Sequence, residues 1–304
     1  MRDREELARR FEGHRDLLGD IAYRMLGSIA EAEDAVQDAW LRLDRAHTVR
    51  EPAAPEIENL AAWLTTVVSR ICLDRLRSRA ARKEDLVDPV DRTAAAPAGA
   101  APGAVYEEPE SEALLADSVG RALLVVLRTL GPDERVAFVL HDLFAVPFDE
   151  IAPIVGRTAA TTKKLASRAR QRVRGASAIP EPDLVRQREV VTAFLAAARA
   201  GDIGRLLNVL SPDVVRTADP EVLPPGVASL VRGATAVAEE TVLLRGRSRV
   251  AGLALVDGRV GLVVAPHGRL AAALLLSVRE DRVAAYEVVA AAGRLDALTI
   301  AVLP

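Results

Sequence analysis

The sequence is poor in cysteine, histidine and aromatic residues, and each shortage excludes a class of structure. Its single cysteine, Cys72, excludes an internal disulfide. Four scattered histidines without paired cysteines argue against a structural zinc site, and we expect neither a metal nor a cofactor. Aromatic residues make up 3% of the chain and hydrophobic residues 50%, so its cores must consist mainly of Ala, Val and Leu.

Long apolar runs are lacking as well. The apolar run at residues 270–278 is too short to cross a bilayer. The N-terminus is charged and lacks the apolar stretch of a secretory signal peptide. We therefore expect a cytoplasmic protein without a membrane partner.

A nucleic-acid-binding surface on this chain must be a local patch, because the net charge is −3. Residues 157–174 form such a patch, with seven basic side chains and no acidic one. Directly before it, residues 147–156 have the pattern of a short helix that ends at a glycine. A helix, a glycine turn and a basic helix are the layout of a DNA-binding helix-turn-helix. The alternative is a basic helix that only faces solvent.

On a helix of ~100° per residue, residues 158–174 separate into two faces. The face expected to pack on the preceding helices carries Thr162, Leu165, Ala166, Ala169 and Val173. The face left for a DNA major groove carries Ala160, Lys163, Lys164, Ser167 and Gln171, with Arg168 and Arg170 at its flanks. Lysine and arginine contact phosphates and can bond guanine edges.

The N-terminal block, residues 5–83, is helical in pattern with a break at residues 52–55. An apolar stripe follows residues 32–43, which by itself fits an ordinary amphipathic helix with a solvated acidic face. The next helical stretch begins apolar, and its end at residues 70–83 holds six basic residues and one acidic residue. Such a helix can lay phosphate-binding groups along DNA. Trp63 fits a core position better than a base-stacking platform.

Two segments divide the rest of the chain. Residues 84–111 form an Ala/Pro/Gly-rich linker, and residues 84–117 hold nine acidic residues and one basic residue. Residues 112–175 are helical again, and residues 176–183 form a hinge with two prolines.

Residues 184–304 mix helices and strands. Helical patterns at 184–200, 202–210 and 234–244 precede strand patterns at 249–256, 260–265, 270–278 and 283–289. Asp257-Gly258 and His267-Gly268 supply turns between strands. The predicted fold class is two all-α domains followed by an α+β domain, in which a four-stranded antiparallel meander wraps around helices.

Residues 23–28 (YRMLGS), 32–40 (AEDAVQDAW) and 62–64 (AWL) resemble region 2 of bacterial extracytoplasmic-function (ECF) sigma factors. Residues 130–144 (LGPDERVAFVLHDLF) and 148–174 resemble region 4 of the same family. The resemblance implies that region 2 (residues 5–83) binds RNA polymerase core and the −10 promoter element, and that region 4 (residues 112–175) reads the −35 element.

Functional residues follow from the resemblance by position. Core polymerase is expected at Glu33, Asp34, Gln37 and Asp38, opposite basic partners. The −10 element is expected at Asn59, Trp63, Arg70, Arg75, Arg77 and Arg79, with a flipped base near Asn59. The −35 element is expected at Lys163, Lys164, Ser167 and Arg168, with Arg170 as a further DNA contact. No catalytic residue and no metal ligand are expected.

Residues 188–202 and 206–214 resemble the opening of a SnoaL-like, NTF2-like cone, here called the cone (residues 184–304). ECF sigma factors with such an extension, including the sigma factor J group, are regulated by it and typically lack a dedicated anti-sigma protein. The resemblance therefore implies intramolecular contacts between the cone and the sigma regions. Three motifs usual in the commonest subgroup are replaced, at residues 87–91, 213–221 and 291–295. The regulatory contacts of that subgroup are therefore not transferred.

Several alternatives stay open. The acidic linker mimics the polyanion that polymerase channels accept, but a disordered, solvated tether explains its composition equally well. A DNA-binding regulator that never meets polymerase, with a small ligand sensed in the cone, is the second functional class. A SnoaL-like isomerase or cyclase is the third, and its candidate acid–base residues are Asp213, His267 and Tyr286.

Overall fold

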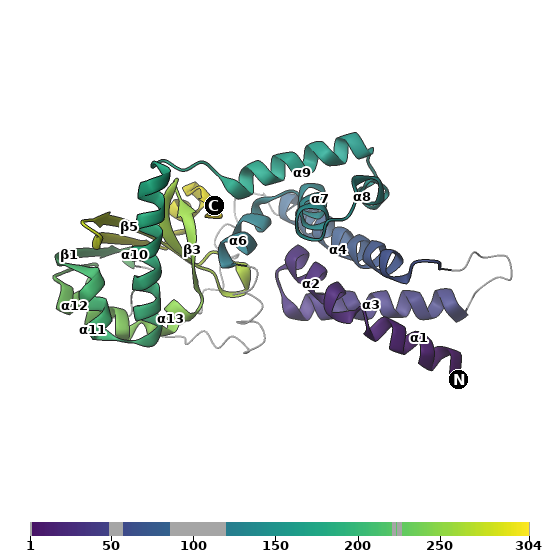
Figure 1. The fold of residues 1–304 in the computed structure, drawn as a ribbon, viewed down its shortest axis with the longest axis horizontal. Coiled ribbons are helices and arrows are strands. Elements are labelled where there is room, and N and C mark those ends of the chain that lie inside the picture. Colours follow the sequence, from purple (N-terminus) through teal and green to yellow (C-terminus); the bar gives the residue numbers. More distant parts are fainter. Residues whose placement is uncertain (1, 49–56, 86–119, 221–222, 224–226, 304) are drawn as a thin grey trace. The chain divides into compact units, whose positions relative to one another are not determined.

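The structure is a computed structural model that describes residues 2–48, 57–85, 120–220, 223 and 227–303. The described elements group into two compact units (Figure 1). The first unit combines the N-terminal helices with residues 129–171. Within the described residues, the second unit combines residues 120–128 with the chain from residue 172 onward. None of the helices described is long and apolar enough to cross a membrane.

The N-terminal part of the first unit consists of α1 (Arg2–Glu12), α2 (Arg15–Leu26), α3 (Ile29–Thr48) and α4 (Leu60–Asp85). Helix α2 ends at Gly27, whose φ of 74° lies in the left-handed region and whose amide donates to Tyr23 O. Helices α2, α3 and α4 pack against one another. The predicted stripe of α3 is confirmed, since Ala32, Ala35, Val36, Ala39 and Leu43 are buried.

The remainder of the first unit contains α7 (Pro132–Phe138), a π-helical turn η1 (Val139–Leu143), α8 (Phe148–Val155) and most of α9 (Ala159–Arg174), whose last three residues belong to the second unit. Helix α8 ends at Gly156, with φ of 71°, and Thr158 Oγ1 accepts a hydrogen bond from the Thr161 amide at the start of α9. These two local signals produce the turn between α8 and α9. The predicted helix-turn-helix is confirmed.

The second unit contains a seven-stranded sheet within the described residues, in the order β2-β1-β6-β5-β4-β3-β7. Strands β3 (Ala251–Val256), β4 (Arg259–Val264), β5 (Ala272–Arg279) and β6 (Arg282–Val289) form the predicted antiparallel meander, with the 3-10 turn η3 (Pro266–Gly268) between β4 and β5. The sequence interpretation missed β1 (Leu210–Ala218), β2 (Leu230–Arg232) and β7 (Ile300–Ala301). β1 pairs in parallel with β6, a partner that no local pattern specifies.

Helices cover the inner face of this sheet. They are α10 (Glu181–Ala200), α11 (Ile203–Val209) and α12 (Ala234–Leu243), followed by the short α13 (Arg245–Arg249). A further short helix, α14 (Ala292–Ala297), lies near the end of the chain. The three long helical predictions for the cone are confirmed, whereas α13 and α14 were not predicted. Phe194 of α10, Leu206 of α11 and Val237 of α12 share one core with Leu262 of β4 and Tyr286 of β6.

The outer face of the sheet is covered by α6 (Arg121–Thr129), which the sequence assigns to region 4. Ala122 and Val125 of α6 pack against small residues of the sheet, including Ala254, Val263 and Ala273. Gly252 permits this approach, because a Cβ there would lie 2.8 Å from Arg121 Cβ. Successive residues of a strand face opposite sides of the sheet. Leu262 of β4 therefore packs in the core with α10, whereas Val263 packs with α6 on the outer face.

Candidate nucleic-acid interface

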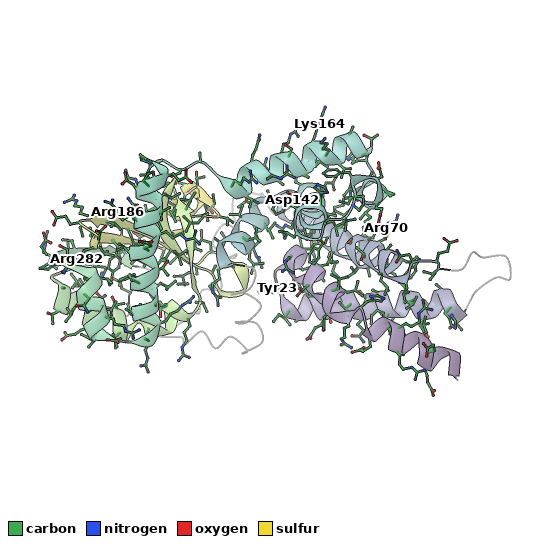
Figure 2. All side chains as sticks on the ribbon, in the orientation of Figure 1. Tyr23, Arg70, Asp142, Lys164, Arg186 and Arg282 are labelled. Atoms are coloured by element: carbon green, nitrogen blue, oxygen red, sulfur yellow. The ribbon has the colours of Figure 1, made fainter. Side chains whose placement is uncertain are left out.

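Helix α9 presents the predicted basic face to solvent. Lys163, Lys164, Ser167 and Arg168 are exposed, whereas Thr162, Ala166 and Ala169 are buried. Figure 2 shows Lys164 pointing away from the helices beneath it. The two predicted faces are therefore confirmed, and the exposed face carries four closely spaced groups suited to phosphates and base edges.

Arg170 at the flank of α9 is held by the fold. Its Nε donates to Asp142 Oδ1 of η1 at 2.6 Å, and its side chain is 36% exposed. This hydrogen bond raises the pKa of the Arg170 guanidinium above its ordinary value. Arg170 thus fixes α9 on η1 and is less available to a groove than the four exposed residues.

Helix α3 presents three of the four predicted core-binding residues. Glu33, Asp34 and Gln37 are exposed and line a groove beside the tilted ring pair of Phe11 and Trp40, whose centroids are 5.2 Å apart. Acidic and amide side chains beside the half-buried Trp40 suit a basic protein partner.

Asp38, the fourth predicted core-binding residue, is half-buried and engaged within the chain. It accepts a hydrogen bond from Arg75 at 2.7 Å. Arg75 also donates to Glu31 O at 2.9 Å, and Arg79 pairs with the Glu31 carboxylate and donates to Leu26 O. These contacts join α3 to α4 and order two arginines that the sequence assigned to DNA.

Arg70 and Arg77, also on α4, contact α7 and α8. Arg70 Nη2 donates to Pro153 O at 3.3 Å, and Arg77 Nη2 donates to Val155 O at 3.1 Å and to Asp133 Oδ1 at 2.8 Å. The last carbonyls of a helix lack intrahelical partners and carry partial negative charge, so the C-terminus of α8 attracts guanidinium groups. Two residues expected to hold −10 DNA are thus bonded to region 4.

Asn59 and Trp63 lie at the beginning of α4. Asn59 Oδ1 accepts a hydrogen bond from the Ala62 amide at 3.0 Å, so its carbonyl oxygen caps the helix. Trp63 is half-buried, so it is more exposed than a core residue and less exposed than a side chain on which a base stacks freely. The flipped-base pocket near Asn59 stays a prediction.

The sequence interpretation missed residues that join the helices of the first unit. Arg135 of α7 is buried and donates to Met25 O at the end of α2 at 2.9 Å. The Arg24 guanidinium lies 5.0 Å from the centroid of the Phe144 ring. Asp133 accepts from Arg77 and also pairs with Arg157 at 3.5 Å. Acidic residues in the first turn, such as Asp133, indicate from the sequence where α7 begins, but they do not indicate which arginines they pair with.

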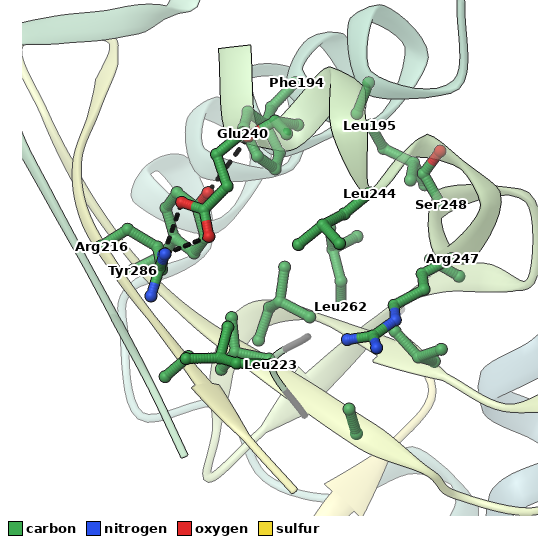
Figure 3. Close-up of a pocket in the computed structure, with 18 residues that line it drawn as sticks. Phe194, Leu195, Arg216, Leu223, Glu240, Leu244, Arg247, Ser248, Leu262 and Tyr286 are labelled. Atoms are coloured by element: carbon green, nitrogen blue, oxygen red, sulfur yellow. Dashed lines mark hydrogen bonds and ion pairs between the residues drawn. The ribbon is translucent and has the colours of Figure 1, made fainter. Parts of the chain in front are cut away.

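The cone contains a cavity between the sheet and its helices (Figure 3). Tyr286 lines it, and burial raises the pKa of the Tyr286 hydroxyl to about 12. Asp213 is exposed and lies outside the lining; the hydrogen bond from Ser211 Oγ, 2.5 Å long, lowers the pKa of its carboxyl. The side chain of His267 and residues 86–119, which include most of the predicted linker at 84–111, lie outside the described part. Among described residues, no group of three or more His, Cys, Asp or Glu side chains could hold a metal ion.

Comparison with known proteins identifies both helical regions. Residues 10–82 match the Sigma-70 region 2 family, and residues 120–173 match the family of Sigma-70, region 4. The ECF RNA polymerase sigma factor SigJ of Mycobacterium tuberculosis is 40% identical over 267 residues, which cover 84% of this chain and 80% of SigJ. The probable ECF RNA polymerase sigma factor SigI of the same species is 34% identical over 301 residues, which cover 98% of each chain.

A solved structure is similar as well. The crystal structure of Mycobacterium tuberculosis SigJ covers 95% of this chain and 98% of its own, with 33% identity and a TM-score of 0.44. The two family matches occur in the order that the sequence motifs predicted, and the SigJ and SigI alignments extend into the cone. The chain therefore belongs to the ECF family of RNA polymerase sigma factors, with regions 2 and 4 followed by an α+β C-terminal domain.

Proposed function

We propose that this sigma factor brings RNA polymerase core to its promoters in the cytoplasm through two separate surfaces, and that its cone regulates region 4. The observation that carries the proposal is the pair of exposed surfaces in the first unit. One is the basic face of α9, and the other is the acidic and aromatic groove of α3. Neither surface needs catalytic chemistry, so the proposed role is non-enzymatic.

The −35 element is assigned to α9. Lys163 and Lys164 contact phosphates or guanine edges, and Ser167 and Arg168 complete the face that enters the major groove. Support comes from the exposure of these four side chains on one face of a helix whose opposite face is buried. Arg170 orients α9 through Asp142.

The −10 element is assigned to α4 and its N-terminus, with Asn59 and Trp63 receiving an unstacked base and Arg70 and Arg77 holding phosphates. Arg75 and Arg79 act mainly by holding α4 on α3, as their partly buried ion pairs indicate. Core polymerase is assigned to Glu33, Asp34 and Gln37, while Asp38 positions Arg75.

This assignment requires a change of state before DNA binds. Contacts with phosphates would compete with the bonds that Arg70 and Arg77 make to the C-terminus of α8, so −10 binding would favour release of region 4 from α4. Core polymerase or promoter DNA would favour the released state because only that state offers these arginines. Free protein would then bind −10 DNA more weakly than the same protein bound to core.

Regulation by the cone is supported by contacts at both ends of region 4. Helix α6 packs on the outer face of the sheet, and Val302 of the cone donates its amide to Val173 O in the last turn of α9 at 2.8 Å. The expected hinge is anchored too, because the Ala178 amide donates to Gly258 O of the β3–β4 turn at 2.8 Å. The cone would thereby restrict the placement of region 4.

Run-off transcription with purified core tests the two surfaces on a promoter selected by binding and sequencing. We expect joint replacement of Glu33, Asp34 and Gln37 by alanine to abolish core binding and leave DNA binding unchanged. Replacement of Lys163 and Lys164 by alanine should weaken DNA binding and leave core binding unchanged. A protein that binds DNA but never binds core would instead be a DNA-binding regulator.

The cone's role is tested in the same assay by comparing the full chain with residues 1–180. Since truncation also uncovers the apolar side of α6, Gly252→Ala in the full chain serves as a second variant. Transcription and core affinity that stay unchanged in both proteins would rule out regulation by the cone.

A further inference from the structure

The cavity of the cone has a volume of about 100 Å³ (Figure 3). It lies between the inner face of the sheet and helices α10, α12 and α13, and its walls are mostly aliphatic, with Leu195, Leu262 and Val264 among them. An engineered apolar cavity of ~150 Å³ holds a benzene molecule, so the about 100 Å³ of this cavity sets an upper limit of one small ring.

One wall of this apolar cavity carries a buried ion pair. Arg216 of β1 is 2% exposed and pairs through two nitrogens with Glu240 of α12, whose side chain is 11% exposed. Arg216 also donates to Ala228 O at 2.8 Å. Desolvating such a pair costs several kcal/mol, and apolar residues of similar volume often stabilise a fold equally well. An ion pair lining a cavity therefore points to recognition of a ligand.

The neighbouring hydroxyls have a defined direction. Thr241 Oγ1 donates its proton to Val237 O at 2.7 Å, so it can only accept from the Tyr286 hydroxyl 3.2 Å away. The Tyr286 hydroxyl therefore donates to Thr241, and the lone pairs of its oxygen are left as acceptors. Arg216 has five N–H donors, and its bonds to Glu240 and Ala228 use three of them. This wall therefore offers the Tyr286 oxygen as an acceptor and the remaining N–H groups of Arg216 as donors.

We propose that this cavity binds a small neutral molecule that is largely apolar and carries one hydroxyl group, in the class of phenols and alicyclic alcohols. The hydroxyl would donate to the Tyr286 oxygen and accept from Arg216, while the ring fills the aliphatic part. The ion pair has no net charge, and a ligand carboxylate beside it would face the Glu240 carboxylate. Arg247 lines another side of the cavity, and it already interacts with another group of the chain.

The probes are phenol, benzene and benzoate, each titrated into the full-length protein without polymerase or DNA. We expect saturable phenol binding in methyl NMR spectra, with shifts at Leu262 and Val264, and a rise in Tm with phenol concentration. Benzoate should bind at least tenfold more weakly than phenol. Because polymerase and DNA are absent, the outcome is independent of the proposed promoter function.

Two variants separate recognition from simple filling of space. Tyr286→Phe removes one hydrogen-bond partner, so phenol affinity should fall by about tenfold while benzene affinity is retained. Ala272→Leu fills the cavity and should abolish binding of both, whereas Leu243→Ala, at a side chain 73% exposed on α12, should change neither. Absence of saturable phenol binding, tighter binding of benzoate, or equal phenol affinity in Tyr286→Phe would overturn the proposal. Tyr286→Phe keeps the test decisive if Ala272→Leu does not fold.

Discussion

Arg77 of α4 and Asp133 of α7 form a two-point contact across 56 residues of sequence, with Nε and Nη2 of Arg77 lying 3.2 and 2.8 Å from Asp133 Oδ1. Asp133 is 20% exposed and Arg77 47% exposed, so the pair is only partly screened by water. The contact joins the residues expected to hold −10 DNA to the region expected to read the −35 element. If Arg77 holds −10 DNA as proposed, region 4 and −10 DNA therefore compete for this one arginine.

Replacing Asp133 with asparagine should raise the affinity of the free protein for a single-stranded −10 oligonucleotide by about twofold to fivefold. Exposed ion pairs are worth ~0.2–1 kcal/mol, which sets this range. Fluorescence anisotropy with labelled oligonucleotide measures the effect. Asp149→Asn removes an equal charge on the exposed first turn of α8 and should change affinity less. If Arg77→Ala also increases affinity, Arg77 does not bind DNA and its assignment is wrong.

Substitution of Gly252 tests the packing of α6 on the sheet. A Cβ at this position lies 2.8 Å from Arg121 Cβ and 3.4 Å from Arg121 Cγ, so Gly252→Ala should overpack the interface and destabilise the second unit by about 1–3 kcal/mol. Hydrogen exchange in α6 should accelerate.

The matched control is Gly246→Ala in α13, where nothing lies within 4 Å of the added Cβ. This variant should be neutral or slightly stabilising, since alanine favours a helix over glycine. Equal protection of α6 from exchange in both variants would contradict tight packing at Gly252.

The salt dependence of promoter binding identifies the lysines that contact phosphate. Lys163→Ala and Lys164→Ala should each weaken binding to −35 duplexes, and a lysine that contacts phosphate should lower the slope of log affinity against log salt by about 1. Arg186→Ala in the cone, which removes an exposed basic group paired with Asp281, should leave the slope unchanged. If both lysine variants keep the wild-type affinity and the wild-type slope, α9 does not bind the −35 duplex.

Asp219 links stability of the cone to pH. Burial raises the pKa of its carboxyl, but amide hydrogen bonds from Ala291 and Ala290 and the contact with Arg294 outweigh this and hold the pKa below its usual value. Asp219 therefore stabilises the folded state above the ordinary Asp pKa of ~3.9, and the contribution is lost as pH falls through the lowered value.

The measurement is Tm against pH for the wild type and Asp219→Asn. The wild type should melt at a higher temperature near neutral pH, and the difference should shrink as the solution becomes acidic. A difference that stays constant down to acidic pH would mean that the carboxylate charge contributes nothing. Exchange of the Ala290 and Ala291 amides should follow the same pH dependence.

Local patterns predicted the elements whose form depends on neighbours in sequence. The two faces of α9 follow from the period of a helix and from the placement of its charges. The β3–β4 hairpin follows from Asp257 and Gly258, whose φ values of 49° and 74° are those that a tight hairpin turn requires. Such preferences are steric and short-range, so the sequence reveals them without knowledge of the rest of the fold.

Long-range partners were decided by the tertiary structure alone. Nothing near Arg77 in the sequence indicates Asp133, and nothing in α6 indicates that Ala122 and Val125 pack on the cone sheet. The parallel pairing of β1 with β6 and the meeting of Arg216 with Glu240 in the cavity also depend on how whole elements pack. The sequence by itself determined the helices, hairpins and exposed charges through local sterics and periodicity. Which charges meet, and which apolar faces cover one another, depends on the packing that leaves the fewest polar groups buried without partners.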